Sequence, residues 1–482
     1  MTPPNSPSGV IYGLDDRPPI LRSIVLALQH VLTMFGSTVA VPLILGPAMG
    51  MDTAQIAVLI SSVMLCSGVA TLIQSTLGSR LPIIQGVSFS FLAAFFIIIG
   101  EIHPEGDESV SAGAAMPYIA GAVMTGALLE IIVGFSGAMG WVRRVLSPVV
   151  VGPVIMLIGL ALYEAGAPIA ASHWPISILT MMLIVLFTFV LSSKGVILRL
   201  FPMLLAILTA VGVCAVGTIT GFFGPDHPAR TDLSAFEQAA WIRGVDMLFP
   251  WGTPQFKFSF IVAVVAGYLA SMIESFGDYH ACKQMAGGGD PTEKEISRGI
   301  GCEGIGCALT GVFGGFSSTS YSENVGLIGL TKVGSRSVVQ IASVILILLG
   351  VFGKFGALAA AIPQPVVGGL YCALFGLISA VGIKQFARAD LSVDRNLFVG
   401  GFSLFMGISV QHYFKSPGVA ESVKEALGPG WGDVIAAVGQ TGMAVAAILG
   451  IALDNLLQAT PEQRGLVITD LTESDTKRND DE

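Results

Sequence analysis

The chain has 482 residues, of which 53% are hydrophobic and only 12% are charged, and its formal net charge is -9. Soluble domains carry about 25% charged residues, so this chain lacks the charge to cover a water-facing surface. Long apolar runs recur instead from Ile24 to Leu456. A bilayer core needs about 20 apolar residues per helix, and the runs meet that length. The composition therefore excludes a soluble protein and predicts an all-α integral membrane protein.

Fourteen apolar segments follow one another along the chain, and each is predicted to span the membrane. They begin near Ser23, Thr53, Leu81, Gly113, Pro148, Pro175, Arg199, Lys257, Gly299, Ser322, Val338, Pro363, Asn396 and Trp431. The third and the tenth are weak as helices. We expect an N-terminal segment (1–22), a first seven-span repeat (23–223), an extracellular loop (224–256), a second seven-span repeat (257–456) and an acidic tail (457–482).

Most of the 24 Lys and Arg residues fall on one side of the predicted spans. Basic residues near span ends mark the cytoplasmic side of a membrane protein. The loop at Glu101–Glu108, on the opposite side, is acidic. Both termini are therefore predicted to be cytoplasmic in a multi-pass protein of the cell membrane, which requires an even number of spans.

An internal repeat links two of the spans. The segment PVVVGPVIMLIGL, which begins at Pro148, aligns without gaps on PVVGGLYCALFGL, which begins at Pro365. These are the fifth and the twelfth spans, and an odd separation of seven spans inverts the second copy. Inverted repeats recur in secondary transporters, which bind their substrate near the midplane where the halves meet.

The eighth span, FIVAVVAGYLASMIESFGDYHA, carries two acidic residues, Glu274 and Asp278. Their i, i+4 spacing places both carboxylates on one helix face, one turn apart. Ionisable groups at this depth are costly and tend to face a cavity or a pathway. Because two like charges repel there, one of the pair is expected to hold a proton near neutral pH, as a proton-coupled site needs. A structural pair hydrogen-bonded to the backbone is the alternative.

The tenth segment, SSTSYSENVGLIGLTK at Ser317–Lys332, is rich in Ser, Thr and Gly. This composition favours an extended stretch followed by a half-helix, with Glu323 near the start of the half-helix. Its counterpart is the third segment, LPIIQGVSFSFLAAFF, which the residues from Gln85 to Phe89 interrupt. Irregular backbone at this depth is tolerated only where it is buried in protein or lines a cavity. The two segments are expected to cross at the centre, where free backbone groups can bind a planar polar ligand.

Other polar residues also fall within predicted spans: Gln29 and His30 in the first, and Glu303 in the ninth. A lone intramembrane His is more often a packing residue than a proton relay, and Glu130 could lie near a helix end. The sequence has no P-loop, no H-E-x-x-H motif and no metal-ligand spacing of His and Cys. No basic strip suggests nucleic acid. We therefore expect neither an enzyme nor a bound metal or cofactor.

The stretch ENVGLIGLTK, Glu323–Lys332, matches the signature of the nucleobase–ascorbate transporter family. That signature is Gln, Glu or Pro, then Asn, any residue, Gly, four variable residues, Thr and one further variable residue. The family also resembles this chain at QH in the first span, GVSFSF in the third, ESFGD in the eighth and GKFGALAAAIPQPVVGG after the tenth. Because the resemblance extends from Leu21 to Leu456, the chain is identified as a member of this family.

The resemblance implies fourteen spans in two inverted sevens. Spans one to four and eight to eleven would form a core domain, and the other six would form a gate domain. A homodimer and elevator-like alternating access are implied as well.

The resemblance also implies roles for particular residues. Carried over by position, the substrate would be bound by Glu274, Glu323, main-chain groups near Phe89 and Ser322, and the neighbouring Ser88 and Tyr321. Asn324 would brace the tenth span. The residues that tie the core helices together and tune coupling would be His30, Asp278 and Glu303.

The residues at three positions narrow the choice of substrate. Ascorbate-type members carry Pro where this chain has Glu323, which argues against ascorbate. Uracil-type members share that Glu but usually have His at the position of Asp278, whereas purine-type members share the acid at Asp278 but many have Gln in place of Glu323. At Glu303 purine members commonly have Asp. The expected substrate is xanthine and/or uracil, with uric acid as a further candidate.

The predicted function is therefore nucleobase uptake by proton symport. A sodium-coupled nucleobase transporter and an anion transporter of similar fold are the alternatives. Anion transporters usually place a basic or neutral group where this chain has Glu323. The third alternative, from another functional class, is a channel or receptor that binds a base without concentrating it.

Overall fold

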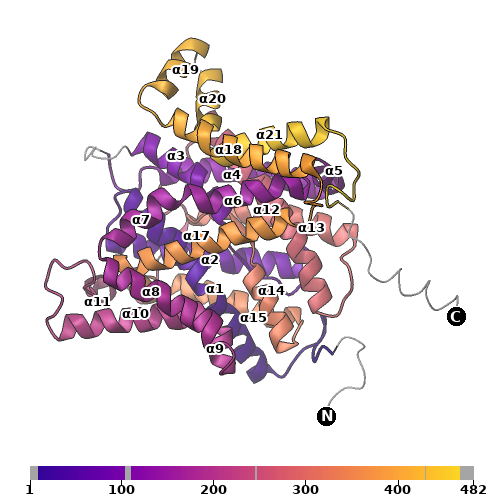
Figure 1. The fold of residues 1–482 in the computed structure, drawn as a ribbon. Helices are drawn as coiled ribbons and strands as arrows, with labels where there is room; N and C mark the ends of the chain where they lie inside the picture. Colours follow the sequence, from indigo (N-terminus) through magenta and orange to yellow (C-terminus); the bar gives the residue numbers. More distant parts are fainter. Residues whose placement is uncertain (1–8, 104–109, 245–246, 429, 467–482) are drawn as a thin grey trace.

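The computed structural model describes residues 9–103, 110–244, 247–428 and 430–466, and within them helices predominate (Figure 1). Residues 1–8 of the predicted N-terminal segment and most of the predicted acidic tail therefore lie outside the described residues, as do parts of the two outer loops. The first half of the chain contains α1 (Ile20–Ala48), α2 (Thr53–Thr76), β1 (Gln85–Val87), η1 (Phe89–Phe91), α3 (Leu92–Ile102), α4 (Met116–Ser136), α5 (Met139–Val145), α6 (Pro148–Ala161), α7 (Tyr163–Ala171), α8 (Trp174–Val185), η2 (Leu186–Val190), α9 (Val196–Leu200), α10 (Pro202–Ile219) and α11 (Ser234–Gln238). The second half contains α12 (Phe258–Met285), α13 (Glu293–Phe313), β2 (Ser318–Ser320), α14 (Ser322–Thr331), α15 (Arg336–Val351), α16 (Gly353–Ala360), α17 (Gln364–Phe386), α18 (Asp394–Phe414), α19 (Val419–Leu427), α20 (Trp431–Gln440) and α21 (Gly442–Leu456).

The predicted multi-span membrane fold is confirmed. In the described residues, 8 helices are long and apolar enough to cross a bilayer, and the bent pair α20–α21 would make a ninth. Shorter apolar helices lie at the third, sixth and eleventh predicted segments, at Phe89–Ile102, Trp174–Val190 and Arg336–Val351. The count of fourteen spans stays a prediction.

The helices differ from the expected spans at two places, although the predicted start of the last span, Trp431, coincides with the start of α20. The ninth span was expected to begin near Gly299, but α13 begins at Glu293 because Thr292 and Glu295 form a capping box that adds a polar first turn. The last span was expected to run on from Trp431, but α20 and α21 meet at an angle of 96°. Gly442 begins α21 at the bend, and a Cβ there would lie 2.8 Å from the carbonyl oxygen of Gly407, so the chain turns where it touches α18.

The repeated segments pack directly against each other. A Cβ on Gly152, near the start of α6, would meet Phe386 at the end of α17. A Cβ on Gly159, further along α6, would lie 2.4 Å from the carbonyl oxygen of Phe375, earlier in α17. The two helices therefore run antiparallel, as an inverted repeat requires, and the small residues of the repeat let their backbones approach closely.

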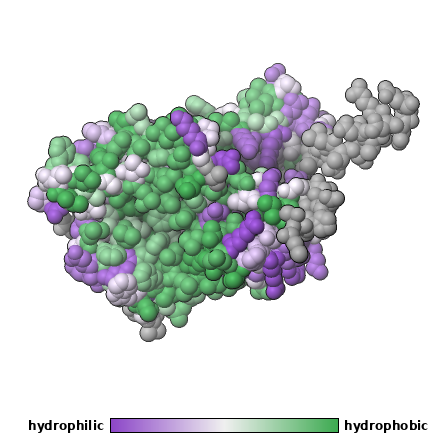
Figure 2. Space-filling model, turned by 90° about the horizontal axis from the view of Figure 1, so that it is seen from below, coloured by the Kyte–Doolittle hydropathy of each residue, from purple (hydrophilic) through white to green (hydrophobic). Residues whose placement is uncertain are grey.

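The outer surface is apolar over wide areas, as a bilayer demands. Figure 2 shows one face on which hydrophobic residues cover most of the surface and hydrophilic residues gather mainly toward one end. Several large side chains on the lipid-length helices are more than half exposed, among them Ile219, Phe405, Val216 and Ile132. Exposed apolar patches of this extent are rare on soluble proteins.

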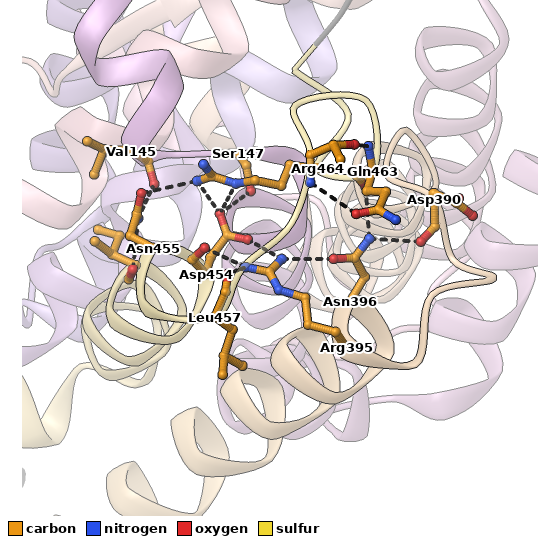
Figure 3. Close-up of polar contacts among 12 residues, drawn as sticks. Val145, Ser147, Asp390, Arg395, Asn396, Asp454, Asn455, Leu457, Gln463 and Arg464 are labelled. Atoms are coloured by element: carbon orange, nitrogen blue, oxygen red, sulfur yellow. Dashed lines mark hydrogen bonds and ion pairs between the residues drawn. The ribbon is translucent and has the colours of Figure 1, made fainter.

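A buried ion-pair cluster holds the end of the last helix (Figure 3). Asp454 of α21 has a fully buried side chain and accepts hydrogen bonds from Arg395 of α18 (2.6 Å), from Arg464 (2.6 Å) and from Ser147 before α6 (2.7 Å). Asn396 donates to the carbonyl oxygen of Gln463 at 2.8 Å. These contacts tie the segment after α21 to the helices α18 and α6, far from the crossing described below.

We predict that Asp454→Ala strongly destabilises the protein, because it leaves two partly buried arginines without their shared acceptor. Removing one partner of a buried ion pair costs ~3–5 kcal/mol. Thermal unfolding of the purified protein in detergent measures the effect. The matched control is Asp433→Ala, which breaks an exposed pair with Lys424 and should cost about 1 kcal/mol at most. Equal melting temperatures for the two variants would contradict the prediction.

Candidate functional site

The two interrupted segments meet as a two-stranded antiparallel sheet. Gln85 pairs with Ser320, Gly86 with Thr319 and Val87 with Ser318. A half-helix follows each strand: η1 and α3 after β1, and α14 after β2. The strands satisfy each other's backbone groups, which is why non-helical chain can exist at this depth. The predicted crossing is thereby confirmed, and the first turns of η1 and α14 present free backbone N–H groups near its centre.

The Tyr321 side chain, which follows β2, contacts β1 across the crossing. Its hydroxyl donates to the carbonyl oxygen of Val87 at 2.9 Å, and the hydroxyl of Thr38 lies 3.3 Å from it. The ring lies over Gly86, where a Cβ would come within 2.4 Å of the phenol carbon. Glycine is therefore required at this position of β1. The Tyr321 side chain, which was expected beside the pocket, is buried and bonded to the strand opposite.

Three carboxylates from two elements gather beside the crossing. Glu323, in the first turn of α14, accepts a hydrogen bond from the Ser37 hydroxyl at 2.9 Å. Asp278 of α12 accepts one from the Ser322 hydroxyl at 2.7 Å, while its second oxygen is buried without a partner among the described residues. Glu274, one turn earlier on α12, is half-buried, and no hydrogen bond within the described part of the chain reaches its carboxylate. Acceptor oxygens therefore remain available for a ligand that donates N–H groups.

A second layer holds these elements in place. Glu303 of α13 is buried and accepts hydrogen bonds from three hydroxyls of α12: Ser271 at 3.2 Å, Ser275 at 2.6 Å and Tyr279 at 2.7 Å. The Ser320 hydroxyl of β2 in turn donates to Ser275 at 2.7 Å. Glu303 therefore connects α13 to α12 and, through Ser275, to the crossing strand.

A separate contact joins the first helix to the half-helix α14. The Asn324 amide donates to the carbonyl oxygen of His30 at 2.9 Å and lies 3.1 Å from the His30 ring nitrogen. Both side chains are buried. His30 is therefore a packing and positioning residue in this geometry, and it lies one layer away from the three carboxylates.

The remaining predicted residues lie on the η1 side. The Ser88 hydroxyl is buried and accepts a hydrogen bond from the backbone N–H of Ser90 at 3.3 Å, and the backbone N–H of Ser88 donates to Ser317 at 2.9 Å. Ser88 thus caps the 3-10 turn. Phe89, which begins that turn, is half-buried and so can offer its ring to the site.

The site is exposed on one side of the protein. Ser322 and Glu323 are exposed, and a side chain at Gly326, on the same face of α14, would meet no atom within 4 Å. On the opposite side, the Tyr371 hydroxyl of α17 donates to the carbonyl oxygen of Ala40 in α1 at 3.0 Å and closes the contact between these helices. The open side is the one where the Lys332 carbonyl, after α14, accepts from the backbone N–H of Ile11 in the N-terminal segment at 2.8 Å.

A cavity of about 230 Å³ lies on the closed side and is separate from the carboxylates. Leu43 of α1, Thr53 of α2 and Pro363 before α17 line it, together with Arg230 and Asp232 of the outer loop. None of the predicted site residues is among its lining residues. The cavity therefore lies beyond the closed contact between α1 and α17.

Sequence reasoning missed the partners of the acidic residues. Ser37, the partner of Glu323, lies seven residues after His30 and hence on the same face of α1, which is a signal that could have found it. The contributions of Ser275 and Tyr279 to Glu303 follow from i, i+4 spacing on α12, but their common target on α13 requires the fold.

These features are typical of a multi-pass membrane transporter: two broken segments cross at the centre, and polar groups lie beside the crossing. Residues 21–416 match the permease family. The chain is 37% identical to solute carrier family 23 member 1 of Mus musculus, over 95% of this chain and 82% of that protein. It is 33% identical to nucleobase-ascorbate transporter 3 of Arabidopsis thaliana, over 93% of this chain and 84% of that one.

Solved structures share the fold at low identity. The transmembrane domain of the cyanobacterium bicarbonate transporter BicA matches with a TM-score of 0.51 and 14% identity, over 92% of this chain and 99% of that one. The murine Solute Carrier 26 family member A9 anion transporter in its inward-facing state matches with a TM-score of 0.55 and 11% identity, over 92% of this chain and 69% of that one. The chain belongs to the nucleobase–ascorbate transporter family, and it is a membrane transporter and not an enzyme.

We predict that Tyr321→Phe weakens ligand binding, because the ring keeps its contact with Gly86 while the carbonyl of Val87 loses its donor. A lost hydrogen bond of this kind costs ~1 kcal/mol, which corresponds to a roughly fivefold higher Kd. Binding titration of the purified variant measures the change. Tyr413→Phe, at an exposed ring, is the matched control and should leave the Kd unchanged. An unaltered Kd in Tyr321→Phe would show that the phenol does not position the strand.

Proposed function

We propose that the chain takes up a nucleobase, namely xanthine, uracil or uric acid, by proton symport with elevator-like alternating access. The observation that carries the proposal is the pair Glu274 and Glu323, which stand on different elements beside the crossing with acceptor oxygens not engaged by the protein. A carboxylate can accept two N–H bonds from the edge of a nucleobase. The backbone N–H groups at the starts of η1 and α14 can donate to its carbonyl oxygens.

The charge of the site argues against anionic substrates. Glu274, Asp278 and Glu323 bring three carboxyl groups together, and the ion pairs of the described residues include none of them. An anion such as ascorbate or bicarbonate would meet repulsion there, whereas a neutral base with N–H donors would not. This disfavours the anion-transporter alternative, although the fold is shared with such proteins. By the same argument xanthine and uracil fit the site better than uric acid, which is an anion at neutral pH.

The closeness of these three carboxyl groups also supports proton coupling. Neighbouring carboxylates cannot all keep their charge away from bulk water, so a proton is the simplest compensating cation. Asp278 is placed to take part, because its bond to Ser322 connects it directly to the start of α14. Sodium coupling is the alternative that the experiment below separates. The proposal also includes a gate domain, to which α17 belongs, and assembly of the protein as a homodimer.

We predict that a pH gradient, acid outside, drives concentrative uptake of one of these bases into proteoliposomes, because each coupled proton carries the gradient's free energy. One pH unit is worth 1.36 kcal/mol, which is up to about tenfold accumulation per coupled proton. Replacing sodium by potassium should leave uptake unchanged. Uptake that ignores the pH gradient but follows sodium would establish the sodium-coupled alternative, and uptake that never exceeds equilibrium would establish a channel.

We predict that replacing Glu274 and replacing Glu323 change ligand binding in different ways. Glu274→Gln removes a charge-assisted acceptor, worth ~1.5–3 kcal/mol, and should raise the Kd for the preferred base by roughly 10- to 100-fold. Glu323→Gln converts one acceptor into a donor and should change the preference among uracil, xanthine, uric acid and guanine more than the amount of protein made. Thermal-shift binding measures both, with the exposed Glu421→Gln as the control. An equal loss for every base in Glu323→Gln would assign a structural role to that residue.

A further inference from the structure

Glu130 is a buried acidic residue that the substrate site does not use. It lies well inside α4, which extends from Met116 to Ser136, and none of its surface is exposed. Neither oxygen of its carboxyl group has a hydrogen-bond partner among the described residues. The possibility that it lies near a helix end is thereby removed. An ionised carboxylate without donors or water is strongly unfavourable, so Glu130 must be present as a neutral acid in this arrangement.

The helix α4, which carries Glu130, packs closely on α13. A Cβ on Gly134 of α4 would lie 2.1 Å from the backbone nitrogen of Gly301, and one on Gly304 of α13 would lie 2.8 Å from Ile131. The titratable groups around Glu130 are Glu303 and Cys307 of α13 and Tyr268 and Tyr279 of α12. None of these groups is a cation, so no positive charge balances the two carboxyls.

The hydroxyl donors of this region have other partners, and the Cys307 thiol, which lies near Glu130, is a weak donor. Ser271, Ser275 and Tyr279 donate to Glu303. The Tyr268 hydroxyl donates to the carbonyl oxygen of Val123 at 2.8 Å, and the Cys307 thiol donates to that of Ser318 at 3.2 Å. The negative charge of the pair therefore belongs on Glu303, which has three donors, and the proton belongs on Glu130. Two neighbouring carboxyls whose charges interact behave as a single titrating unit.

We propose that Glu130 and Glu303 form a two-carboxyl proton site behind β2, whose proton content follows the conformation of the substrate site. This inference rests on the proposed proton symport and adds a second place where a coupled proton is held. With one proton the pair carries a single negative charge. A further proton, taken from water at the open side, forms an O–H bond on Glu303 and neutralises the pair, and its loss to water on the other side restores the charge.

Ser275 connects this proton site to the crossing. Its hydroxyl donates to Glu303 at 2.6 Å and accepts from the Ser320 hydroxyl at 2.7 Å, and it lies 3.2 Å from the Thr319 hydroxyl. A shift of β2 when a substrate is bound alters how strongly Ser275 can donate to Glu303. The charge on Glu303 is then stabilised more or less, and the pair releases or takes up a proton accordingly. Glu130 acts through Glu303 and is a positioning residue for the proton, not a ligand of the substrate.

A proton suits this site better than sodium. Hard cations such as sodium require several oxygen ligands, whereas the hydroxyls here are committed to Glu303 and the neighbour of Glu130 on α13 is the Cys307 thiol, a soft ligand.

Infrared spectroscopy of the purified full-length protein tests the proposal without substrate. The carbonyl stretch of protonated carboxylic acids is compared between about pH 5 and pH 8, the range in which a coupled carboxyl pair must titrate to follow physiological gradients. The expected result is a pH-dependent acid band that is lost in Glu303→Gln and a pH-independent acid band that is lost in Glu130→Gln, with both bands kept in the exposed control Glu421→Gln. Persistence of the pH-dependent band in Glu303→Gln, or of the pH-independent band in Glu130→Gln, overturns the proposal. A band that disappears when sodium replaces potassium at constant pH would assign the site to sodium instead, and would overturn it too.

Transport provides an independent arm. In proteoliposomes given xanthine or uracil, Glu303→Gln should reduce the accumulation driven by one pH unit by about tenfold, the value of one coupled proton, while exchange of labelled for unlabelled base continues. Unchanged accumulation in Glu303→Gln overturns the inference. If the unmodified protein transports neither base, the proposed function fails while the infrared result still decides the proton site. Should Glu303→Gln not fold, Glu130→Gln must shift the pH at which the Glu303 band appears, and an unshifted band contradicts the pairing.

Discussion

The fold depends on the pairing of two three-residue strands, β1 and β2, inside the membrane-spanning helices. Breaking two helices at this depth exposes backbone donors and acceptors that water cannot reach, which costs several kcal/mol for each group left unpaired. Pairing the breaks with each other removes that cost and leaves the starts of η1 and α14 pointing at a common centre. Nearly every polar contact around the site follows from this constraint. Examples are the hydrogen bond from the Tyr321 hydroxyl to the Val87 carbonyl and the hydrogen bond from Ser320 of β2 to Ser275.

Around the crossing, acidic groups are arranged in two layers with different partners. Glu274, Asp278 and Glu323 face the open side and retain acceptor capacity, which fits a ligand rich in N–H donors. Glu303 lies behind them with its oxygens occupied by hydroxyls of α12. The first layer is suited to reversible binding, because Glu323 is exposed and Glu274 is half-buried beside the buried Asp278. The second is suited to holding the elements together, and with Glu130 to holding a proton.

Much of this arrangement could be predicted from the sequence, because the physical demands of a bilayer leave clear patterns. The Ser, Thr and Gly residues around Tyr321 and the interruption at Gly86 predicted paired breaks, and the 274/278 spacing predicted two acids on one face. The strand register, the partner of each acid and the open side could not be predicted. Ser37 and Glu323 are 286 residues apart in the chain, and only the folded structure brings them into contact.

Where the predictions failed, local geometry outweighed the apolar pattern. The capping box at Thr292 extended α13 beyond its hydrophobic run, and the close approach of Gly442 to α18 broke the last span. Glu130 was ambiguous in the sequence because helix ends and helix centres of a Gly-rich span look alike. Its environment on α13 resolves that ambiguity and gives it a role that hydropathy could not suggest.

The most direct test of the account is a structure of the protein with xanthine or uracil bound, determined by electron cryo-microscopy. The account predicts density for the base between Glu274 and Glu323, at the ends of β1 and β2, with its polar edge toward the two carboxylates. Density in the cavity lined by Arg230 and Asp232, with the crossing empty, would contradict it.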